Sequence, residues 1–168
     1  MTERTKETVL LTREGYEYKK RLLEEYRRRL YDEIPRRLKR AAEHGRELRE
    51  NKEYIDIKRE QEFLEAEVRR LEELLDNAQI LEDYQVSTDF VGLGSRIILE
   101  DRELRRVDTI ELVSPAEADL ERRKISVESP VGQALINRHV GEEVEVELPN
   151  GKVVRYRVLG IEGRGERG

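Results

Sequence analysis

Residues 44–54 read HGRELRENKEY, a short charged stretch between two long segments that both have helical periodicity. Gly45 is the only glycine between Gly15 and Gly92, and it lies where the first helix must end and the chain must turn back. We therefore predict that this stretch is the exposed tip of a helical hairpin. Residues on exposed tips contribute to function more often than to core packing.

Three glutamates follow Gly45 at intervals of three residues, namely Glu47, Glu50 and Glu53. In a helix this spacing places carboxylates on adjoining turns. Two carboxylates held together on an exposed tip can take up a shared divalent metal ion. The plainer interpretation is that they are negative charges favoured near a helix N-terminus, and composition alone favours that interpretation.

The composition of the 168-residue chain bounds its fold and its compartment. It is 42% charged, 36% hydrophobic and 5% aromatic, which is too polar for one thick core and favours elongated helical structure. The absence of cysteine excludes a disulfide framework and a thiolate site, and His44 and His139 are too few for a histidine-based metal centre. No signal peptide or membrane-spanning stretch is evident, so we expect a soluble cytoplasmic protein.

The charges are unevenly distributed. A formal net charge of −5 argues against a general nucleic-acid coat protein, which needs excess lysine and arginine to displace counterions from phosphates. The first arm is nevertheless basic, with Arg27, Arg28, Arg29, Arg36, Arg37, Lys39 and Arg40. Such a run is usually a solvated helix face. The alternative is contact with RNA or DNA that a protein docked elsewhere meets locally.

The first arm is expected to begin at Thr12, whose hydroxyl can cap the helix by accepting an otherwise unpaired backbone N–H. Its apolar residues recur mainly at spacings of three and four and form one stripe: Tyr16, Leu22, Leu23, Tyr26, Leu30, Ile34, Leu38, Ala41 and Ala42. Pro35 lies inside this pattern and removes the hydrogen bond to residue 31. We therefore expect a kink at Pro35.

The second arm has the clearer register. Its seam alternates by three and four through Tyr54, Ile57, Gln61, Leu64, Val68, Leu71, Leu75 and Ala78, as in a two-helix coiled coil. An arm of about thirty residues reaches roughly 45 Å. We predict an antiparallel α-helical coiled-coil hairpin within residues 1–82. Because this hairpin satisfies its own seam, we expect a monomer.

A different pattern begins after Asn77. Residues 83–90 indicate a linker, and four short strand patterns follow: SRIILED, VDTIELVS, EEVEVELP and KVVRYRVLGIE. The last two are joined at Asn150-Gly151, where both residues tolerate positive φ. Ser129-Pro130 opens a short helix. Residues 91–162 are thus expected to form a small antiparallel β-sheet domain with one helix, and residues 163–168 a flexible tail. The predicted class is α+β.

Four stretches of sequence carry a resemblance to a known family. They are LTREGY at 11–16, the tip HGRELRENKEY, NAQIL at 77–81, and KISVESPVGQALINRHVGEEVEVELPNG at 124–151. Together they look like the bacterial transcript-cleavage factors of the GreA/GreB family, and the similarity covers nearly the whole chain. The resemblance implies a coiled-coil N-terminal domain and a C-terminal domain of FKBP-like fold.

The resemblance also implies a function. The C-terminal domain of the family docks on bacterial RNA polymerase at the rim of the secondary channel, and the coiled coil reaches down that channel. The acidic tip then helps to hold a second Mg²⁺ and the attacking water, so that a backtracked transcript is cut and the arrested complex is rescued. Such a factor is not a free-standing enzyme, because it activates the polymerase's own endonucleolytic cleavage. The Mg²⁺ is shared with the polymerase and is not bound stably by the factor alone.

The tip carries over to this chain residue by residue. Leu48, Glu50, Asn51, Glu53 and Tyr54 match the family's L-x-E-N-x-E-Y without a gap. The resemblance therefore assigns Glu47 and Glu50 as the catalytic, metal-holding acids, and it assigns Arg46, Asn51, Glu53 and Tyr54 as residues that support the tip.

The tip departs from the family pattern at one point. The family usually has Asp directly after the glycine, whereas here Arg46 and Glu47 follow Gly45, as though one residue had been inserted. An ion pair from Arg46 to Glu47 or Glu50 would weaken metal binding. This departure leaves an alternative open, in which a Gre-like paralogue occupies the channel and inhibits or regulates the polymerase without promoting cleavage.

The resemblance assigns further contacts outside the tip. Arg36, Arg37 and Arg40 resemble a basic patch that contacts the RNA 3′ end. A second match, Ser129, Pro130 and Val131, corresponds to the segment through which the C-terminal domain approaches the polymerase, although Ser-Pro also suffices as a helix start. His44 is either a helix-end cap or a functional group. His139 is expected to be structural.

Two other classes of protein remain as alternatives. A purely structural coiled-coil spacer would explain the two arms. A free-standing prolyl isomerase would fit an FKBP-like fold, but the C-terminal half has a single phenylalanine and few other aromatic residues, Tyr156 among them, to line an apolar pocket.

Overall fold

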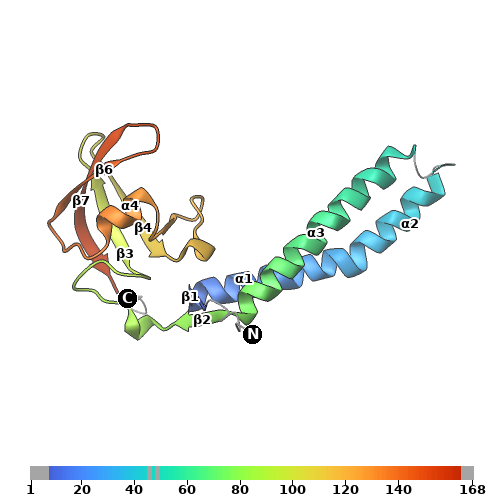
Figure 1. Ribbon diagram of the computed structural model, residues 1–168, viewed down its shortest axis with the longest axis horizontal. Coiled ribbons are helices and arrows are strands. Elements are labelled where there is room, and N and C mark those ends of the chain that lie inside the picture. Colours follow the sequence, from blue (N-terminus) through green and yellow to red (C-terminus); the bar gives the residue numbers. More distant parts are fainter. Residues whose placement is uncertain (1–7, 45–46, 48–49, 164–168) are drawn as a thin grey trace, which may run out of the picture. The chain divides into compact units, whose positions relative to one another are not determined.

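The computed structural model of the chain describes residues 8–44, 47 and 50–163 (Figure 1). It divides into two compact units, one containing Tyr16–Ala78 and the other containing Thr8–Gly15 and the chain from Gln79 onward. The predicted turn at Gly45, the supporting residue Arg46, and the tail beyond residue 163 lie outside the described residues. Within the described ranges, none of the helices combines the length and apolar character needed to cross a membrane.

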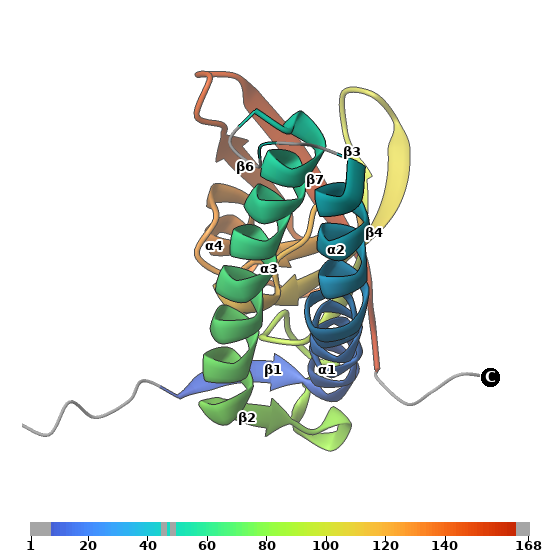
Figure 2. The same cartoon turned by 90° about the vertical axis from the view of Figure 1, so that its right-hand side faces the viewer.

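The helical hairpin that the sequence predicts is present, with its two arms side by side (Figures 1 and 2). Its first arm consists of α1 (Arg13–Arg28), a π-helical segment (Arg29–Glu33) and α2 (Ile34–His44), and its second arm is α3 (Lys52–Asp76). The buried side chains of its core are Leu23, Leu30, Ile34, Ala41, Ile57, Leu64, Val68 and Leu71. All of them belong to the two predicted stripes, so the amphipathic pattern accounts for the hairpin.

The interruption expected at Pro35 takes the form of a π-helix. This five-residue segment, Arg29–Glu33, lies directly before Ile34 and Pro35. Pro35 has no N–H to donate to the carbonyl of Tyr31, and its ring crowds that carbonyl. The backbone N–H of Ile34 donates to the carbonyl of Arg29, five residues earlier. The first arm thus accommodates the proline by widening one turn of helix.

The C-terminal unit is built around a five-stranded sheet in the order β5-β4-β3-β7-β6. The strands are β3 (Arg96–Asp101), β4 (Arg106–Val113), β5 (Lys124–Ser126), β6 (Glu143–Glu147) and β7 (Val153–Glu162). Three of the pairings are antiparallel, but β4 and β5 run parallel. The prediction of a wholly antiparallel sheet is therefore wrong for β5. The chain leaves β4 through a crossover at 114–123, which allows the next strand to pair in the parallel sense.

One face of this sheet carries the core of the C-terminal unit. Its buried residues include Ile97 and Leu99 of β3, Ile110 and Leu112 of β4, and Val158 of β7. The short helix α4 (Pro130–Leu135) contributes the fully buried Leu135. The alternation predicted for β6 is confirmed, because its two valines are buried and its three glutamates are exposed. An α+β fold is thus confirmed, as a long helical hairpin and a mixed sheet with a short helix.

The turn between β6 and β7 differs in detail from the prediction. Gly151 has a positive φ of 83°, whereas Asn150 does not. The N–H of Gly151 donates to the carbonyl of Leu148, and the N–H of Lys152 donates to the Asn150 side chain. Only the glycine therefore needs the left-handed conformation, as in a hairpin with one residue more than the tightest loop.

Two short strands and two 3₁₀ turns are also present, and none of them was predicted from the sequence. Strands β1 (Val9–Thr12) and β2 (Ala78–Leu81) pair in a separate two-stranded sheet (Figure 2). The 3₁₀ turns are Asp83–Gln85, at the start of the expected linker, and Pro115–Glu117, in the crossover after β4.

A buried carboxylate explains the LTREG sequence at the start of α1. Glu117 is only 4% exposed, and its carboxylate accepts hydrogen bonds from the backbone N–H of Thr12, at 3.0 Å, and from the Thr12 hydroxyl. The Thr12 oxygen in turn accepts the N–H of Gly15 at 3.0 Å, which confirms the predicted helix cap. Lys124 Nζ lies 3.2 Å from the same carboxylate and balances its charge. Residues 8–15 are thereby part of the C-terminal unit.

Gly15→Ala tests this arrangement. A Cβ at residue 15 would lie 2.0 Å from Oε1 of Glu117, so the carboxylate would have to leave Thr12. Alanine improves helix propensity by about 1 kcal/mol, but each buried polar group left unpaired costs about 1–3 kcal/mol. We expect a net loss in the free energy of unfolding, measured by chemical denaturation.

The matched control is Gly92→Ala, where the nearest atom to an added Cβ is 3.8 Å away on the Phe90 ring. It should change stability little. A Gly15→Ala protein more stable than the parent would contradict the proposed role of Glu117.

Candidate functional site at the hairpin tip

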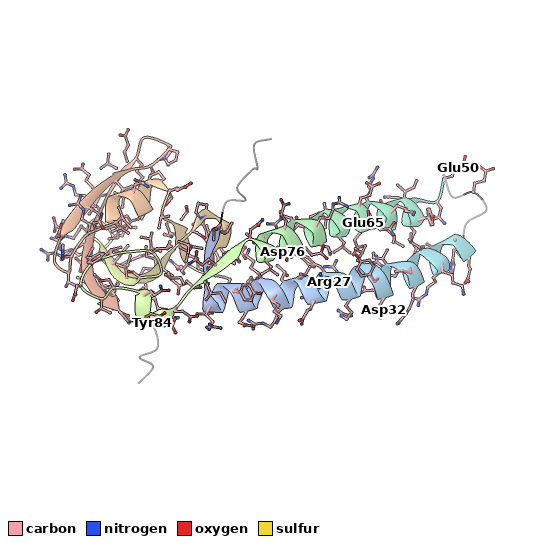
Figure 3. The ribbon with its side chains drawn as sticks, turned by 60° about the horizontal axis from the view of Figure 1, so that its bottom comes forward. Arg27, Asp32, Glu50, Glu65, Asp76 and Tyr84 are labelled. Atoms are coloured by element: carbon pink, nitrogen blue, oxygen red, sulfur yellow. The ribbon has the colours of Figure 1, made fainter. Side chains whose placement is uncertain are left out.

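The tip joins two helix ends. Helix α2 ends at His44 and α3 begins at Lys52, so the tip lies between these residues. Glu47 and Glu50 are both exposed, and the N–H of Glu50 donates to the carbonyl of Glu47 at 3.2 Å. Figure 3 shows Glu50 at the far end of the hairpin with its side chain directed into solvent. Both predicted acids are therefore available to a partner.

The side chain of Asn51 contacts both arms just below the tip. Its Oδ1 accepts the backbone N–H of Tyr54 at 3.1 Å, which makes it the N-cap of α3. Its Nδ2 donates to the carbonyl of Ala41 in α2 at 2.8 Å. At the end of α2, Nδ1 of His44 donates to the carbonyl of Arg40 at 2.7 Å. Of the two interpretations of His44, the structure supports the helix-end cap.

The other two predicted supporting residues lie on the first turn of α3. Glu53 is exposed, and an acid at this position interacts favourably with the helix dipole. Tyr54 is partly buried and packs against the hairpin core, and the ammonium of Lys58 lies 5.9 Å from its ring. Tyr54 therefore anchors the start of α3 to the seam.

The carboxylates of the tip are ligands of a kind that Mg²⁺ accepts. Mg²⁺ prefers carboxylate oxygens and requires six ligands, most of them waters or substrate phosphates. Glu47 and Glu50 supply such oxygens. Among the residues that the structure describes, no group of three or more histidine, aspartate or glutamate side chains is arranged to hold a metal.

Arg37, one of the three basic-patch residues, is engaged across the hairpin. Glu60 of α3 receives its guanidinium at 2.8 Å and that of Arg29 at 2.9 Å. Although partial burial by itself raises the pKa of Glu60, hydrogen bonds from the two arginines hold this pKa below the ordinary value of 4.5. Arg37 is thus held against α3, where it shares the carboxylate of Glu60 with Arg29.

Arg36 and Arg40 lie on the solvent side of α2 and are both exposed. Residues four apart share one helix face, so these two cations form a continuous surface. Arg36 pairs with Asp32 one turn earlier, and both partners of that ion pair are largely exposed. Surface pairs of this kind exchange readily for other anions, because each contributes at most about 1 kcal/mol.

The segment Ser129–Val131 opens α4. Ser129 Oγ accepts the N–H of Gly132 at 3.1 Å and donates to the carbonyl of Ser126 at 2.6 Å, which confirms the predicted N-cap. Pro130 is exposed at the first position of the helix, and Val131 is partly buried. The side chain of Val131 points to a cavity in the C-terminal unit, described next.

A cavity of about 260 Å³ lies on the core face of the sheet beside α4. Its apolar residues are Leu99, Ile110, Ile125, Val131 and Leu120, and its polar residues are Asp101, Arg106, Asp108, Arg123 and Tyr156. Leu120 is 81% exposed, so an apolar side chain stands at the rim. Burial raises the pKa of the Tyr156 phenol, and the nearby charges of Asp101 and Asp108 raise it further.

The lining of this cavity does not favour prolyl isomerisation, which uses an apolar pocket with aromatic residues. Tyr156 is the one aromatic residue among the described residues that line it. Val131 and Tyr156 were recognisable from the sequence, whereas Leu120 and Asp108 were not predicted. Alternation in β3 and β4 could have indicated the inward-facing acids. No periodic signal marks Leu120, because it lies in the irregular crossover after β4.

Comparison with known proteins gives consistent matches over both units. Residues 9–80 match the family model described as transcription elongation factor, N-terminal, and residues 86–163 match transcription elongation factor, GreA/GreB, C-term. Transcription elongation factor GreA of Thermosipho melanesiensis is 40% identical over 93% of this chain and 97% of its own length. GreA of Syntrophomonas wolfei is 40% identical over 92% of this chain and 96% of its own.

One solved structure is also similar in sequence. The crystal structure of GreA factor homolog 1 (Gfh1) of Thermus thermophilus has 35% sequence identity and a TM-score of 0.42, and the match covers 93% of this chain and 99% of that chain.

Proposed function

This chain belongs to the GreA/GreB family of transcription elongation factors, and from that premise we propose that it stimulates transcript cleavage by bacterial RNA polymerase. Family membership implies RNA polymerase as its partner. On this proposal the factor binds through the secondary channel in the bacterial cytoplasm and rescues backtracked, arrested complexes. The observation that carries the proposal is the exposed pair Glu47 and Glu50 at the end of the hairpin.

The tip residues have a limited chemical role in this proposal. A bound Mg²⁺ would activate a water molecule and neutralise charge on the transferring phosphate. Glu47 and Glu50 would supply carboxylate ligands to the ion, and one of them would orient the attacking water by accepting its hydrogen bond. The factor completes a site that the polymerase largely provides, and it cuts nothing when alone.

A second candidate function rests on the sequence of the tip. Arg46 and Glu47 follow Gly45 where the family usually has a single Asp. A longer tip with an added cation would occupy the same channel and place its carboxylates out of reach of the metal. The chain would then be a channel-occupying regulator that inhibits the polymerase. The two candidates predict the same binding and opposite effects on cleavage.

The distinguishing experiment uses a stalled, backtracked bacterial elongation complex with Mg²⁺. We expect the wild-type factor to shorten the transcript, and Glu47→Gln or Glu50→Gln to lower the cleavage rate about 100-fold, because each removes a carboxylate that holds the ion or orients the attacking water. Binding should remain. Glu65→Gln, an exposed charge loss further down α3 (Figure 3), is the control and should cleave normally.

Either of two results would overturn this assignment. Wild-type factor that binds but leaves the transcript uncut, or slows the polymerase's intrinsic cleavage, would favour the channel-occupying regulator. A tip whose charges can be reversed without any effect on paused complexes would favour the coiled-coil spacer.

We assign the RNA contact of this proposal chiefly to Arg36 and Arg40. Their exposed guanidinium groups are available to phosphates, whereas Arg37 is only partly exposed and its guanidinium is bonded to Glu60. The extruded RNA 3′ end would pass along this face of α2. Arg37 then contributes to RNA contact mainly by holding the arm against α3.

Substitution of the patch checks this ranking. Arg36→Gln and Arg40→Gln should each reduce photo-crosslinking of the factor to the RNA 3′ end about tenfold, because a hydrogen bond to a charged group contributes about 1.5 kcal/mol or more. Arg37→Gln should have a smaller effect, and Arg59→Gln, exposed on α3, none. Equal effects at all four positions would contradict a localised patch.

The polymerase-docking surface of this proposal includes Ser129, Pro130 and Val131 and extends into the cavity beside them. An apolar side chain from the polymerase would fill the cavity beneath Leu120, and the mixed charges at its rim would orient the partner. Ser129 contributes by starting α4 in the correct place.

Leu120→Asp tests docking without disturbing the core, because this side chain is 81% exposed. We expect its affinity for the polymerase, measured by competition, to fall about tenfold or more, as for an apolar anchor residue. Val107→Asp makes the same change at a position on β4 that is 60% exposed and does not line the cavity, and it should bind normally. Equal affinities of the two variants would contradict docking at the cavity.

A further inference from the structure

Among the described residues of the tip, Asn51 is the side chain that forms hydrogen bonds with both arms. Its Oδ1 accepts the N–H of Tyr54 at 3.1 Å, and its Nδ2 donates to the carbonyl of Ala41 at 2.8 Å. Ala41 is completely buried in the hairpin core, and Tyr54 packs against the same core. The two residues whose backbone groups contact Asn51 are therefore held in place by core packing.

The hydrogen bond from Tyr54 satisfies a group that the start of α3 leaves unpaired, because the first N–H groups of a helix have no acceptor within it. Ala41 lies in the last turn of α2, and Tyr54 lies in the first turn of α3. One side chain thus caps the N-terminal end of α3 and also donates a hydrogen bond to the last turn of α2.

Only an amide of this length can make both bonds. Asparagine carries an acceptor oxygen and a donor NH₂ on one short side chain. Aspartate keeps the acceptor but would present a second oxygen to the carbonyl of Ala41. Serine also keeps an acceptor for the N-cap but has a shorter reach. Glutamine would place the amide one methylene further from its partners.

We propose that Asn51 is the positioning residue of the tip, which fixes where Glu47 and Glu50 are presented relative to the two arms. This inference rests on the proposed function of those carboxylates. Asn51 links the last turn of α2 to the first turn of α3, so its two hydrogen bonds set the separation of the helix ends between which Glu47 and Glu50 lie. An error of about 1 Å in placing a reacting group can lower a rate about 100-fold.

Asn51 does not itself act on the metal in this proposal. Its oxygen and its NH₂ group are both directed to backbone atoms, and the residue is only partly exposed. The contribution of Asn51 to cleavage is therefore indirect, unlike that of Glu47 and Glu50. Its loss should lower cleavage without lowering binding. Polymerase docking depends on the C-terminal unit and on the hairpin as a whole, which Asn51 does not form.

The cleavage test uses Asn51→Ser and Asn51→Asp, which retain an acceptor for the N-cap of α3 and lose the donor to Ala41. We expect the cleavage rate at saturating factor to fall about tenfold or more, with the half-saturating concentration of factor unchanged. The matched control is Asn77→Ser at the C-terminal end of α3, which should cleave like wild type. Wild-type rates in both Asn51 variants would overturn the proposal, as would a parallel loss of binding and cleavage.

A second readout does not depend on cleavage. Because the chain has no cysteine, a pair of spin labels can be introduced at Glu43 and Lys52, which are exposed on α2 and α3. The distance distribution between the labels should be narrow in the parent and broader in Asn51→Ser, and should stay narrow in Asn77→Ser. An unchanged distribution in Asn51→Ser would overturn the positioning role. If wild-type factor failed to cleave, the proposed function would fail, while this measurement would still test Asn51.

Discussion

The seam of buried side chains between α1–α2 and α3 is the contact on which the geometry of the tip depends. A chain that is 42% charged has few apolar residues to bury, and the hairpin concentrates its share in one narrow stripe. Ile34, Leu64 and Leu71 are completely buried within it. Ion pairs such as Arg27–Glu72 lie outside the seam and are largely exposed, so they contribute little to stability. Hydrophobic burial holds the arms together, and it leaves the outer faces free for charge.

The parts of the fold that were predictable are those set by local pattern. Helical spacing identified both arms, and Thr12 and Ser129 were recognised as caps because their hydroxyls satisfy neighbouring N–H groups. Strict alternation identified β6. The π-helical segment, the short strands β1, β2 and β5, and the parallel pairing of β5 were not predicted. Strands of three or four residues carry little periodicity, and they form because distant segments provide their partners.

The candidate site shows the same division. The positions of Glu47 and Glu50 followed from the break in helical pattern, since a charged stretch with one glycine between two amphipathic segments is exposed. Contacts between residues far apart in the sequence could not be predicted in this way. Thr12 and Glu117 are 105 residues apart in sequence, and Arg37 meets Glu60 across the hairpin. Whether an arginine is available to a ligand or bonded to another segment depends on such long-range pairing. No periodic signal in a single sequence indicates this pairing.

The central claim is that the tip reaches the catalytic metal of RNA polymerase. It is tested most directly by replacing the polymerase's Mg²⁺ with Fe²⁺ in a backtracked complex and generating hydroxyl radicals, which cleave only the protein backbone close to the ion. The account predicts that the bound factor is cut within residues 44–54 and nowhere in the C-terminal unit. A factor that binds the complex but is left intact, or is cut only outside the hairpin tip, would contradict it.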